Sequence, residues 1–209
     1  MKKYSKIQSI YKRDPATKFK TFLPGEYSEP EFEYLKNCDW TFTEKIDGMN
    51  MRVIFNKDET SVRFAGRTDR AEIHPQLMER VQELFPADRL DNVFTRDATL
   101  YGEGYGPGIQ SGGWYNVDEK DFILFDILID GEWWLDRGAV EDIAGGLEIK
   151  SCHVFDFGPL SDAEKIVREG FNSFFGDGLA EGIVARPLIP VRARDGSRII
   201  TKIKTRDYK

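Results

Sequence analysis

Lys45 lies in the run EKIDG (residues 44–48), at the point where one apolar–polar alternation ends and another begins. A lysine there can project into a cleft, because Gly48 lets the backbone pass closely beneath a ligand. Lysine reacts as a nucleophile only in its neutral form, and with an ordinary pKa of about 10.4 it is almost fully protonated at pH 7. Taken alone, this short motif is typical of a charged turn. Whether Lys45 has a catalytic role therefore depends on the other charged residues of the chain.

Two carboxylates lie in strand-like segments in the middle of the chain. Glu103 stands between small residues in YGEGYG, where a carboxylate could hold a ribose hydroxyl or a metal. Asp126 follows Phe125 inside the apolar run 122–129. Because a buried aspartate without a partner is costly, Asp126 either takes part in a hydrogen bond or faces a cleft.

Further charged residues follow near the C-terminal end. Glu181 stands at the start of a strand-like segment that ends near Arg186. The two-residue period then places Lys202, Lys204 and Arg206 on one face of a strand. Adjacent lysines on one strand face repel each other unless an anion lies between them, so this pattern predicts an anion close by.

Several familiar sites are absent from the sequence. No GxxxxGK[ST] loop occurs, the glycines of residues 102–108 never match GxGxxG, and neither HExxH nor GxSxG is present. The two histidines, His74 and His153, have no companions typical of a catalytic site, so a structural or surface role is expected for each. The chemistry of the chain must therefore rest on its lysines, arginines and carboxylates.

The elements that position these residues can be read from periodicity. Alternation predicts strands at 40–43, 49–55 and 62–65, and the apolar run 122–129 predicts a strand buried on both faces. Helical spacing predicts a helix at 75–85, and a capping box at Ser161-Asp162 with Glu164 predicts a second helix that carries Phe171. Strands and helices mix without regular β–α alternation, which favours an α+β fold with mostly antiparallel sheets. No repeat or linker divides residues 1–209, so we expect a single domain.

Composition narrows the class of protein. A chain of 209 residues with 40% hydrophobic residues can bury its own core, and two distant cysteines form neither a disulfide framework nor a zinc site. We expect a cytoplasmic protein without membrane association, because no segment approaches the roughly 18 apolar residues of a membrane span. The net charge of −6 hides two basic ends: residues 1–20 carry seven Lys/Arg against one acid, and residues 186–209 carry eight against two. If the ends meet, they could track a phosphate backbone; otherwise they are solvated termini.

Taken in order, the segments EKIDG, GRT, YGEGYG, LFD, EGIVAR and KIK resemble the motifs of the covalent nucleotidyltransferases. This superfamily comprises ATP-dependent DNA ligases, RNA ligases and mRNA-capping guanylyltransferases. The resemblance extends from about Trp40 to Lys204 and implies the nucleotidyltransferase (ATP-grasp-like ligase) fold, with sheets flanking a nucleotide cleft. The local variant is most similar to the phage-type RNA ligases that seal nicks, because Asn50 stands where DNA ligases usually place an arginine.

The resemblance also implies roles for individual residues. Lys45 would carry the nucleotide, and the positive charge of Lys202, Lys204 and a metal would favour its neutral amine. The other implied contacts are Glu44 with adenine, Asp47, Gly48 and Asn50 with the nucleotide, Arg67 with phosphate or ribose, Glu103 with ribose or metal, Phe125 with the base, Glu181 with metal, and Lys202 and Lys204 with the α-phosphate. The implied cofactors are ATP and Mg²⁺ or Mn²⁺. The implied partner is RNA, for example a nicked duplex or an RNA/DNA hybrid, bound by a monomer.

Other interpretations stay open at this point. One is a minimal DNA ligase, another a capping guanylyltransferase, and a third a nucleic-acid-binding domain that has lost turnover. A generic acidic α+β domain would need six coincidences in order. Only five residues follow Lys204, so we expect no C-terminal OB-fold or accessory domain.

Overall fold

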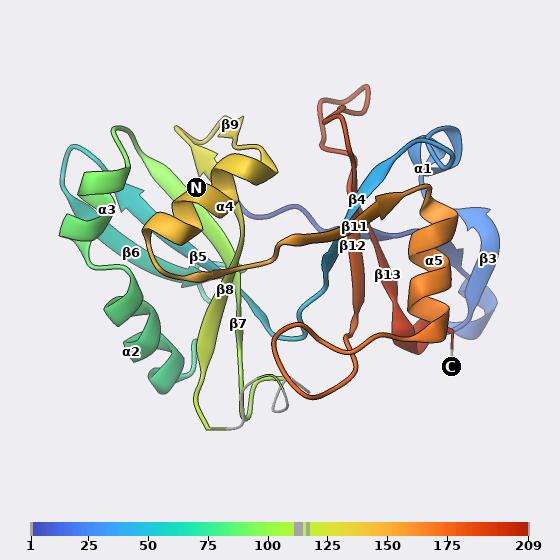
Figure 1. Cartoon of the computed structure of the whole chain (residues 1–209), viewed down its shortest axis with the longest axis horizontal. Coiled ribbons are helices and arrows are strands. Elements are labelled where there is room, and N and C mark those ends of the chain that lie inside the picture. Colours follow the sequence, from blue (N-terminus) through green and yellow to red (C-terminus); the bar gives the residue numbers. More distant parts are fainter. Residues whose placement is uncertain (1, 111–114, 116–117, 209) are drawn as a thin grey trace. The chain divides into compact units, whose positions relative to one another are not determined.

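The structure is a computed structural model that describes residues 2–110, 115 and 118–208. Its elements form two compact units, each of mixed α and β structure (Figure 1). Unit 1 comprises Met1–Ser5 and Ile46–His153, and unit 2 comprises Lys6–Lys45 and Val154–Lys209. The chain thus passes between the units three times, which explains why the sequence has no linker between two successive blocks.

Unit 1 is built on a six-stranded sheet that is mostly antiparallel. Its order is β10-β8-β7-β5-β6, with β9 on β8, and only β10 pairs in parallel. The strands are β5 (Met49–Asn56), β6 (Ser61–Gly66), β7 (Ala98–Tyr105), β8 (Asp121–Ile129), β9 (Trp133–Trp134) and β10 (Lys150–Ser151). The strands predicted at 49–55, 62–65 and 122–129 are therefore confirmed. Nearly all of β8 is buried, as its apolar run predicted.

The helices of unit 1 cover its sheet and close one hydrophobic core. They are α2 (Pro75–Leu84), α3 (Ala87–Val93) and α4 (Arg137–Gly146), and α2 and α4 pack against β8 (Figure 1). The predicted helix at 75–85 is confirmed. The backbone N–H of Gln76 donates to the His74 imidazole at 3.3 Å, so His74 has the structural role that was expected.

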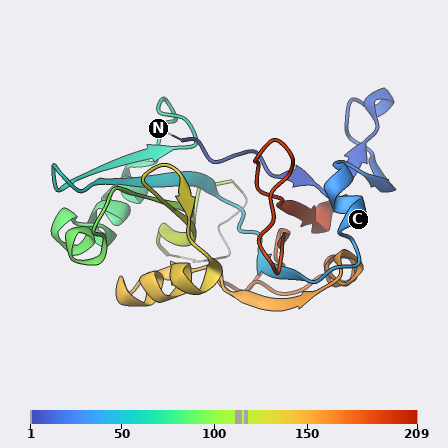
Figure 2. The ribbon, with the colours of Figure 1, turned by 90° about the horizontal axis from the view of Figure 1, so that it is seen from above.

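Unit 2 is built on a five-stranded sheet and a separate hairpin. The sheet order is β1-β13-β12-β4-β11, and β1 lies parallel to β13 (Figure 2), while the hairpin joins β2 and β3. Helix α5 packs on β11, β12 and β13, over a core of its own. The elements are β1 (Gln8–Ser9), β2 (Tyr11–Arg13), η1 (Pro15–Thr17), β3 (Phe22–Tyr27), α1 (Pro30–Tyr34), β4 (Trp40–Glu44), β11 (Val154–Gly158), α5 (Leu160–Glu169), β12 (Gly182–Pro187), β13 (Thr201–Lys204) and η3 (Thr205–Asp207).

The helix predicted from Ser161-Asp162 is present as α5, but three details predicted for unit 2 were wrong. Helix α5 begins at Leu160 after Pro159, without a side-chain cap, so Ser161 lies inside the helix and no capping box forms. The helix ends at Glu169, and Gly170, with a φ of 79°, follows it, so Phe171 lies outside. Strand β13 ends at Lys204, so Arg206 lies in the 3₁₀ turn η3 rather than on the strand. Among the described residues, none of the helices combines the length and the apolar character of a membrane span.

Candidate active site

Three strand ends of unit 2 bring two lysines to one carboxylate. Lys45 follows β4, Glu181 precedes β12 and Lys204 ends β13, and these strands are neighbours in the sheet. The Lys45 Nζ lies 2.5 Å from Glu181 Oε2, and the Lys204 Nζ lies 2.5 Å from Glu181 Oε1. The anion predicted beside the lysines of β13 is therefore supplied by the protein itself, in the nucleotide-free chain.

The cluster carries more positive than negative charge. Burial by itself would raise the pKa of the Glu181 carboxyl, but Lys45 and Lys204 together hold it below its ordinary value. Lys202, on the same face of β13, has its pKa lowered to about 8 by burial and by the charges of Lys204 and Lys45. Lys45 and Lys204 thus share the Glu181 carboxylate with a third lysine close by, so the site suits an anion that brings several negative charges.

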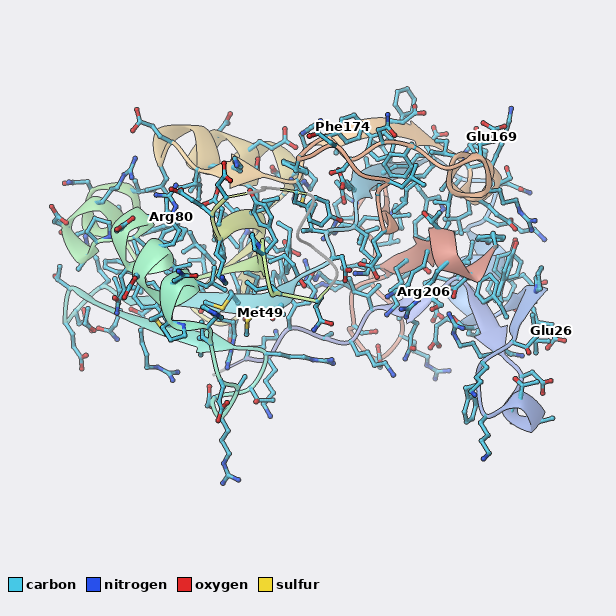
Figure 3. The ribbon with its side chains drawn as sticks, turned by 90° about the horizontal axis from the view of Figure 1, so that it is seen from below. Glu26, Met49, Arg80, Glu169, Phe174 and Arg206 are labelled. Atoms are coloured by element: carbon cyan, nitrogen blue, oxygen red, sulfur yellow. The ribbon has the colours of Figure 1, made fainter. Side chains whose placement is uncertain are left out.

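Glu44 is buried beside this cluster, at the end of β4. Its carboxylate Oε2 accepts a hydrogen bond from the Phe174 backbone N–H at 2.8 Å (Figure 3 labels Phe174), whereas no described residue forms a hydrogen bond with the buried Oε1. Burial raises the pKa of Glu44, against the hydrogen bonds from Ser173 and Phe174 that lower it. The sequence carried no signal for the loop that orients this carboxyl, because the loop lies outside every periodic segment.

Gly48 permits a close approach of two backbone segments in unit 1. A Cβ at Gly48 would stand 2.3 Å from the Gly104 carbonyl oxygen and 2.9 Å from the Glu103 Cγ. No residue with a side chain fits there without a shift of β7. The Asp47 backbone N–H next to it donates to the Tyr115 hydroxyl at 3.1 Å. The glycine of EKIDG therefore seats the start of β5 on the strand that carries Glu103.

Asn50 and Glu103 are cross-strand partners. They face each other in the β5–β7 register, so their side chains leave the same face of the sheet. The Asn50 Oδ1 is buried and has no hydrogen-bond partner in the part of the chain that the structure describes. The glycines on either side of Glu103 are required by packing: a Cβ at Gly102 would lie 2.0 Å from the Phe122 ring, and one at Gly104 would lie 2.4 Å from the Leu77 side chain.

Phe125 is the extra residue of a β-bulge. Tyr101 pairs with Asp126 and Gly102 with Leu124, so Phe125 has no partner on β7. Its ring meets Tyr4 edge-on at a centroid distance of 5.0 Å. The hydroxyl of Tyr4 donates to the Asp126 carboxylate at 2.7 Å in a buried position. Of the two roles expected for Asp126, the structure shows the hydrogen bond.

The last predicted residue, Arg67, lies near Asn50 and Glu103, at the end of the unit 1 sheet where β5 begins. Arg67 follows Gly66, which pairs with Met51 at the end of β6, and its side chain is exposed. The predicted site residues thus form two groups, joined in the chain by the Lys45–Ile46 peptide bond. Unit 2 holds Glu44, Lys45, Glu181, Lys202 and Lys204, and unit 1 holds Asp47, Gly48, Asn50, Arg67, Glu103 and Phe125. Within the described part of the chain, no group of three or more His, Cys, Asp or Glu side chains is placed to hold a metal.

Comparison with known proteins identifies the family. The RNA ligase family matches residues 39–204. A variant of the Naegleria gruberi RNA ligase with ATP and Mn superposes with a TM-score of 0.71 at 20% identity, covering 100% of this chain and 57% of that one. The same ligase with PPi gives a TM-score of 0.67 at 24% identity over 86% and 53% of the two chains. A further variant of that ligase, with AMP and Mn, gives a TM-score of 0.67 at 22% identity and covers 99% of this chain and 58% of its own.

These solved structures share the fold of this chain, which spans just over half of their length. The predicted α+β class with mostly antiparallel sheets is confirmed by the strand pairing and by these likenesses. The family match covers most of the sequence and runs from Asp39 to Lys204, the interval in which the ordered motifs were found. The chain therefore belongs to the RNA ligase family.

Proposed function

We propose that this chain is an ATP-dependent RNA ligase, which joins a 3′-hydroxyl end to a 5′-phosphate end through AMP carried on Lys45. The observation that carries the proposal is the contact of both Lys45 and Lys204 with the Glu181 carboxylate, with Lys202 close enough to feel the charges of all three. This cluster combines a nucleophilic amine with an excess of positive charge, and attack on a phosphate of ATP requires both. Membership of the RNA ligase family supports it, and the Naegleria gruberi structures are described with ATP, AMP, PPi and Mn.

In the first step, the neutral amine of Lys45 forms a bond to the α-phosphorus of ATP while the bond from that phosphorus to pyrophosphate breaks. The amine releases its proton to solvent. The ion pair between Lys45 and Glu181 must open first, because a paired ammonium group has no lone pair to offer. Lys202 and Lys204 neutralise the phosphate charge during the transfer, so their role is positioning and charge stabilisation.

Glu44 is our candidate for recognition of adenine. Its buried Oε1 has no hydrogen-bond partner among the described residues, while Oε2 accepts a hydrogen bond from the Phe174 N–H. Such an oxygen accepts a hydrogen bond from the exocyclic amino group of adenine. Guanine presents a carbonyl at the same position, which would leave two acceptors face to face. Preference for ATP over GTP follows from this single contact.

Glu181 of unit 2 and Glu103 of unit 1 are each a candidate ligand of a divalent metal. Mg²⁺ is commonly bound by one or two carboxylates together with substrate phosphates and water. When bound, the metal supplies positive charge to the phosphates. Engagement of Glu181 by a metal would also weaken its hold on Lys45.

In the remaining steps, AMP passes from Lys45 to the 5′-phosphate of a polynucleotide, and a 3′-hydroxyl then displaces AMP to close the strand. We infer RNA as the substrate from the family and from Asn50, which takes the place of the arginine usual in DNA ligases. Nicked duplexes that differ only in a ribose or a deoxyribose at the 3′ end test this inference. Equal or better sealing of the deoxyribose end would assign the chain to DNA joining.

The experiment that tests the nucleophile is covalent labelling with α-labelled ATP and Mg²⁺, followed by denaturation. Wild type should retain label, and Lys45→Ala should retain none, because the covalent bond to AMP is formed by the Lys45 amine and alanine has no nucleophile to replace it. Lys165→Ala, an exposed lysine of α5, is the matched control and should label like wild type. Equal labelling of Lys45→Ala and wild type would remove Lys45 from this role, and labelling by GTP instead of ATP would indicate a guanylyltransferase.

A further inference from the structure

The two basic ends of the chain meet in unit 2 and form one groove. Strand β1 near the N-terminus lies parallel to β13 near the C-terminus, with Gln8 opposite Thr201 and Ser9 opposite Lys202. The groove beside them has a volume of about 730 Å³ and is lined from both ends of the chain; Figure 3 labels Arg206 and Glu26 of its lining. Its cations are Lys6, Lys12, Arg13, Lys202, Lys204 and Arg206, and Glu26 is the one acid in its lining.

Most of this positive charge is not neutralised by the protein. Arg13 pairs with Asp207 at 2.5 Å, and Lys204 pairs with Glu181. The other four cations form no salt bridge with a described residue, and three of them are exposed: Lys6, Lys12 and Arg206. The charge of Lys6 also contributes to the low pKa of Lys202, so positive charge is crowded across the groove. A chain of negative charges relieves such crowding.

An exposed aromatic ring stands in the same lining. Phe19 is 63% exposed, and it follows the turn η1 in the β2–β3 hairpin. Lys18 and Phe19 have φ values of 55° and 59°, which are uncommon for residues with side chains. The turn holds them there: the Lys18 N–H donates to the Pro15 carbonyl and the Phe19 N–H to the Asp14 carbonyl, each at 3.0 Å. Backbone strain of this kind is common at functional sites, so its presence at an exposed aromatic residue indicates a function for the Phe19 ring.

We propose that this groove binds the RNA strand, with its cations along the phosphate backbone and Phe19 stacked on a base. Cations beside an exposed aromatic ring are the combination by which proteins hold single-stranded nucleic acid. Lys202 and Lys204 belong both to the groove lining and to the cluster around Glu181. The groove therefore adjoins the cluster in which Lys45 would carry AMP. That the strand is RNA rests on the proposed function.

The structure also divides the basic N-terminal residues. Lys2 and Lys3 belong to unit 1, where the Lys2 carbonyl accepts a hydrogen bond from the Tyr101 hydroxyl at 2.8 Å. Lys6 and Lys12 belong to unit 2 and line the groove. The basic surface inferred from charge alone is therefore smaller than the whole N-terminal segment. It consists of the residues from Lys6 onward together with those of β13 and η3.

The test measures binding of a fluorescent 5′-phosphorylated RNA single strand by anisotropy, at several salt concentrations and without ATP. Lys6→Gln/Lys12→Gln should weaken binding about tenfold or more at low salt and lower the slope of log affinity against log salt by about 1.5, since each phosphate contact contributes roughly 0.7 for single strands. Phe19→Ala should weaken binding at least about fivefold with the salt slope unchanged. The matched controls are Lys165→Gln, another exposed lysine of unit 2, and Phe157→Ala, whose ring is 64% exposed on β11.

Self-adenylylation with labelled ATP should stay at the wild-type level in all these variants, which shows that they are folded and separates the groove from the nucleotide chemistry. Wild-type affinity and salt slope in both groove variants would overturn the proposal, as would equal losses in the controls. Displacement of the RNA by polyglutamate at matched charge would assign the groove to acidic peptides and overturn it as well. Normal RNA binding in a chain that never labels with ATP would support the groove and refute the proposed enzyme.

Discussion

Replacement of Glu181 by glutamine removes the negative charge that pairs with Lys45 and Lys204, while it preserves the shape of the side chain. The Glu181 side chain is 13% exposed, and those of its partners Lys45 and Lys204 are 20% and 14% exposed, so water screens these pairs only in part. Loss of one partner from a buried ion pair costs about 3–5 kcal/mol, and the partial exposure reduces this figure. We expect Glu181→Gln to lower the free energy of unfolding by about 2–3 kcal/mol at pH 7.

The pH dependence of this difference gives the prediction a second, independent readout. The pKa of Glu181 is lowered in the folded chain from its ordinary value of 4.5, so its stabilising effect is complete above that value. The effect is lost as the pH falls through the lower pKa of the folded state. The gap between wild type and Glu181→Gln should therefore be constant from pH 7 down to about 5 and shrink below 4.5.

Urea unfolding of the nucleotide-free proteins, followed at several pH values, measures both quantities. Glu169→Gln is the control, because Glu169 is an exposed carboxylate at the end of α5, and its loss should change stability by no more than about 0.5 kcal/mol. A Glu181→Gln variant as stable as wild type at pH 7 would refute the reasoning. So would a gap that persists unchanged at pH 3, since a protonated Glu181 resembles glutamine.

Three further predictions address other parts of the site. Glu44→Gln should lower the preference for ATP over GTP in covalent labelling by about tenfold, because glutamine can donate to the guanine carbonyl; an unchanged ratio would place base recognition elsewhere. Gly48→Ala should destabilise the chain by about 1–3 kcal/mol in urea unfolding, because its Cβ would meet a carbonyl oxygen at 2.3 Å, whereas Gly145→Ala on α4, with nothing within 4 Å, should be neutral or stabilising. Tyr4→Phe should cost about 1–3 kcal/mol in the same assay, because it leaves the Asp126 carboxylate short of a buried hydrogen bond; a smaller loss would mean that another group replaces the hydroxyl.

Local patterns in the sequence predicted the elements whose residues interact with near neighbours. The strands on either side of Lys45 and the helix α2 follow from periods of two and of 3.6 residues, which reflect one buried face each. The predicted cap of α5 was wrong, because the helix begins at Leu160 and Ser161 lies inside it, while Glu164 accepts a hydrogen bond from Tyr11, 153 positions away. Helix α4 was not predicted, although Asp136 is a typical N-cap residue: its side chain accepts a hydrogen bond from the Ala139 N–H at 2.8 Å.

What the sequence by itself determined is the set of strands around the motifs, the order of those motifs, and through them the family. What only the tertiary structure decided is which charges meet. Glu181 lies 136 residues from Lys45 in the chain, and Tyr4 lies 122 residues from Asp126, yet both pairs are in direct contact. The pairing of β1 with β13 likewise divides the basic N-terminal residues between two units. The periodicity of a sequence indicates which face of an element is buried, but it does not indicate the register between strands that are far apart in the chain. That register brings the Glu181 carboxylate to the amines of Lys45 and Lys204.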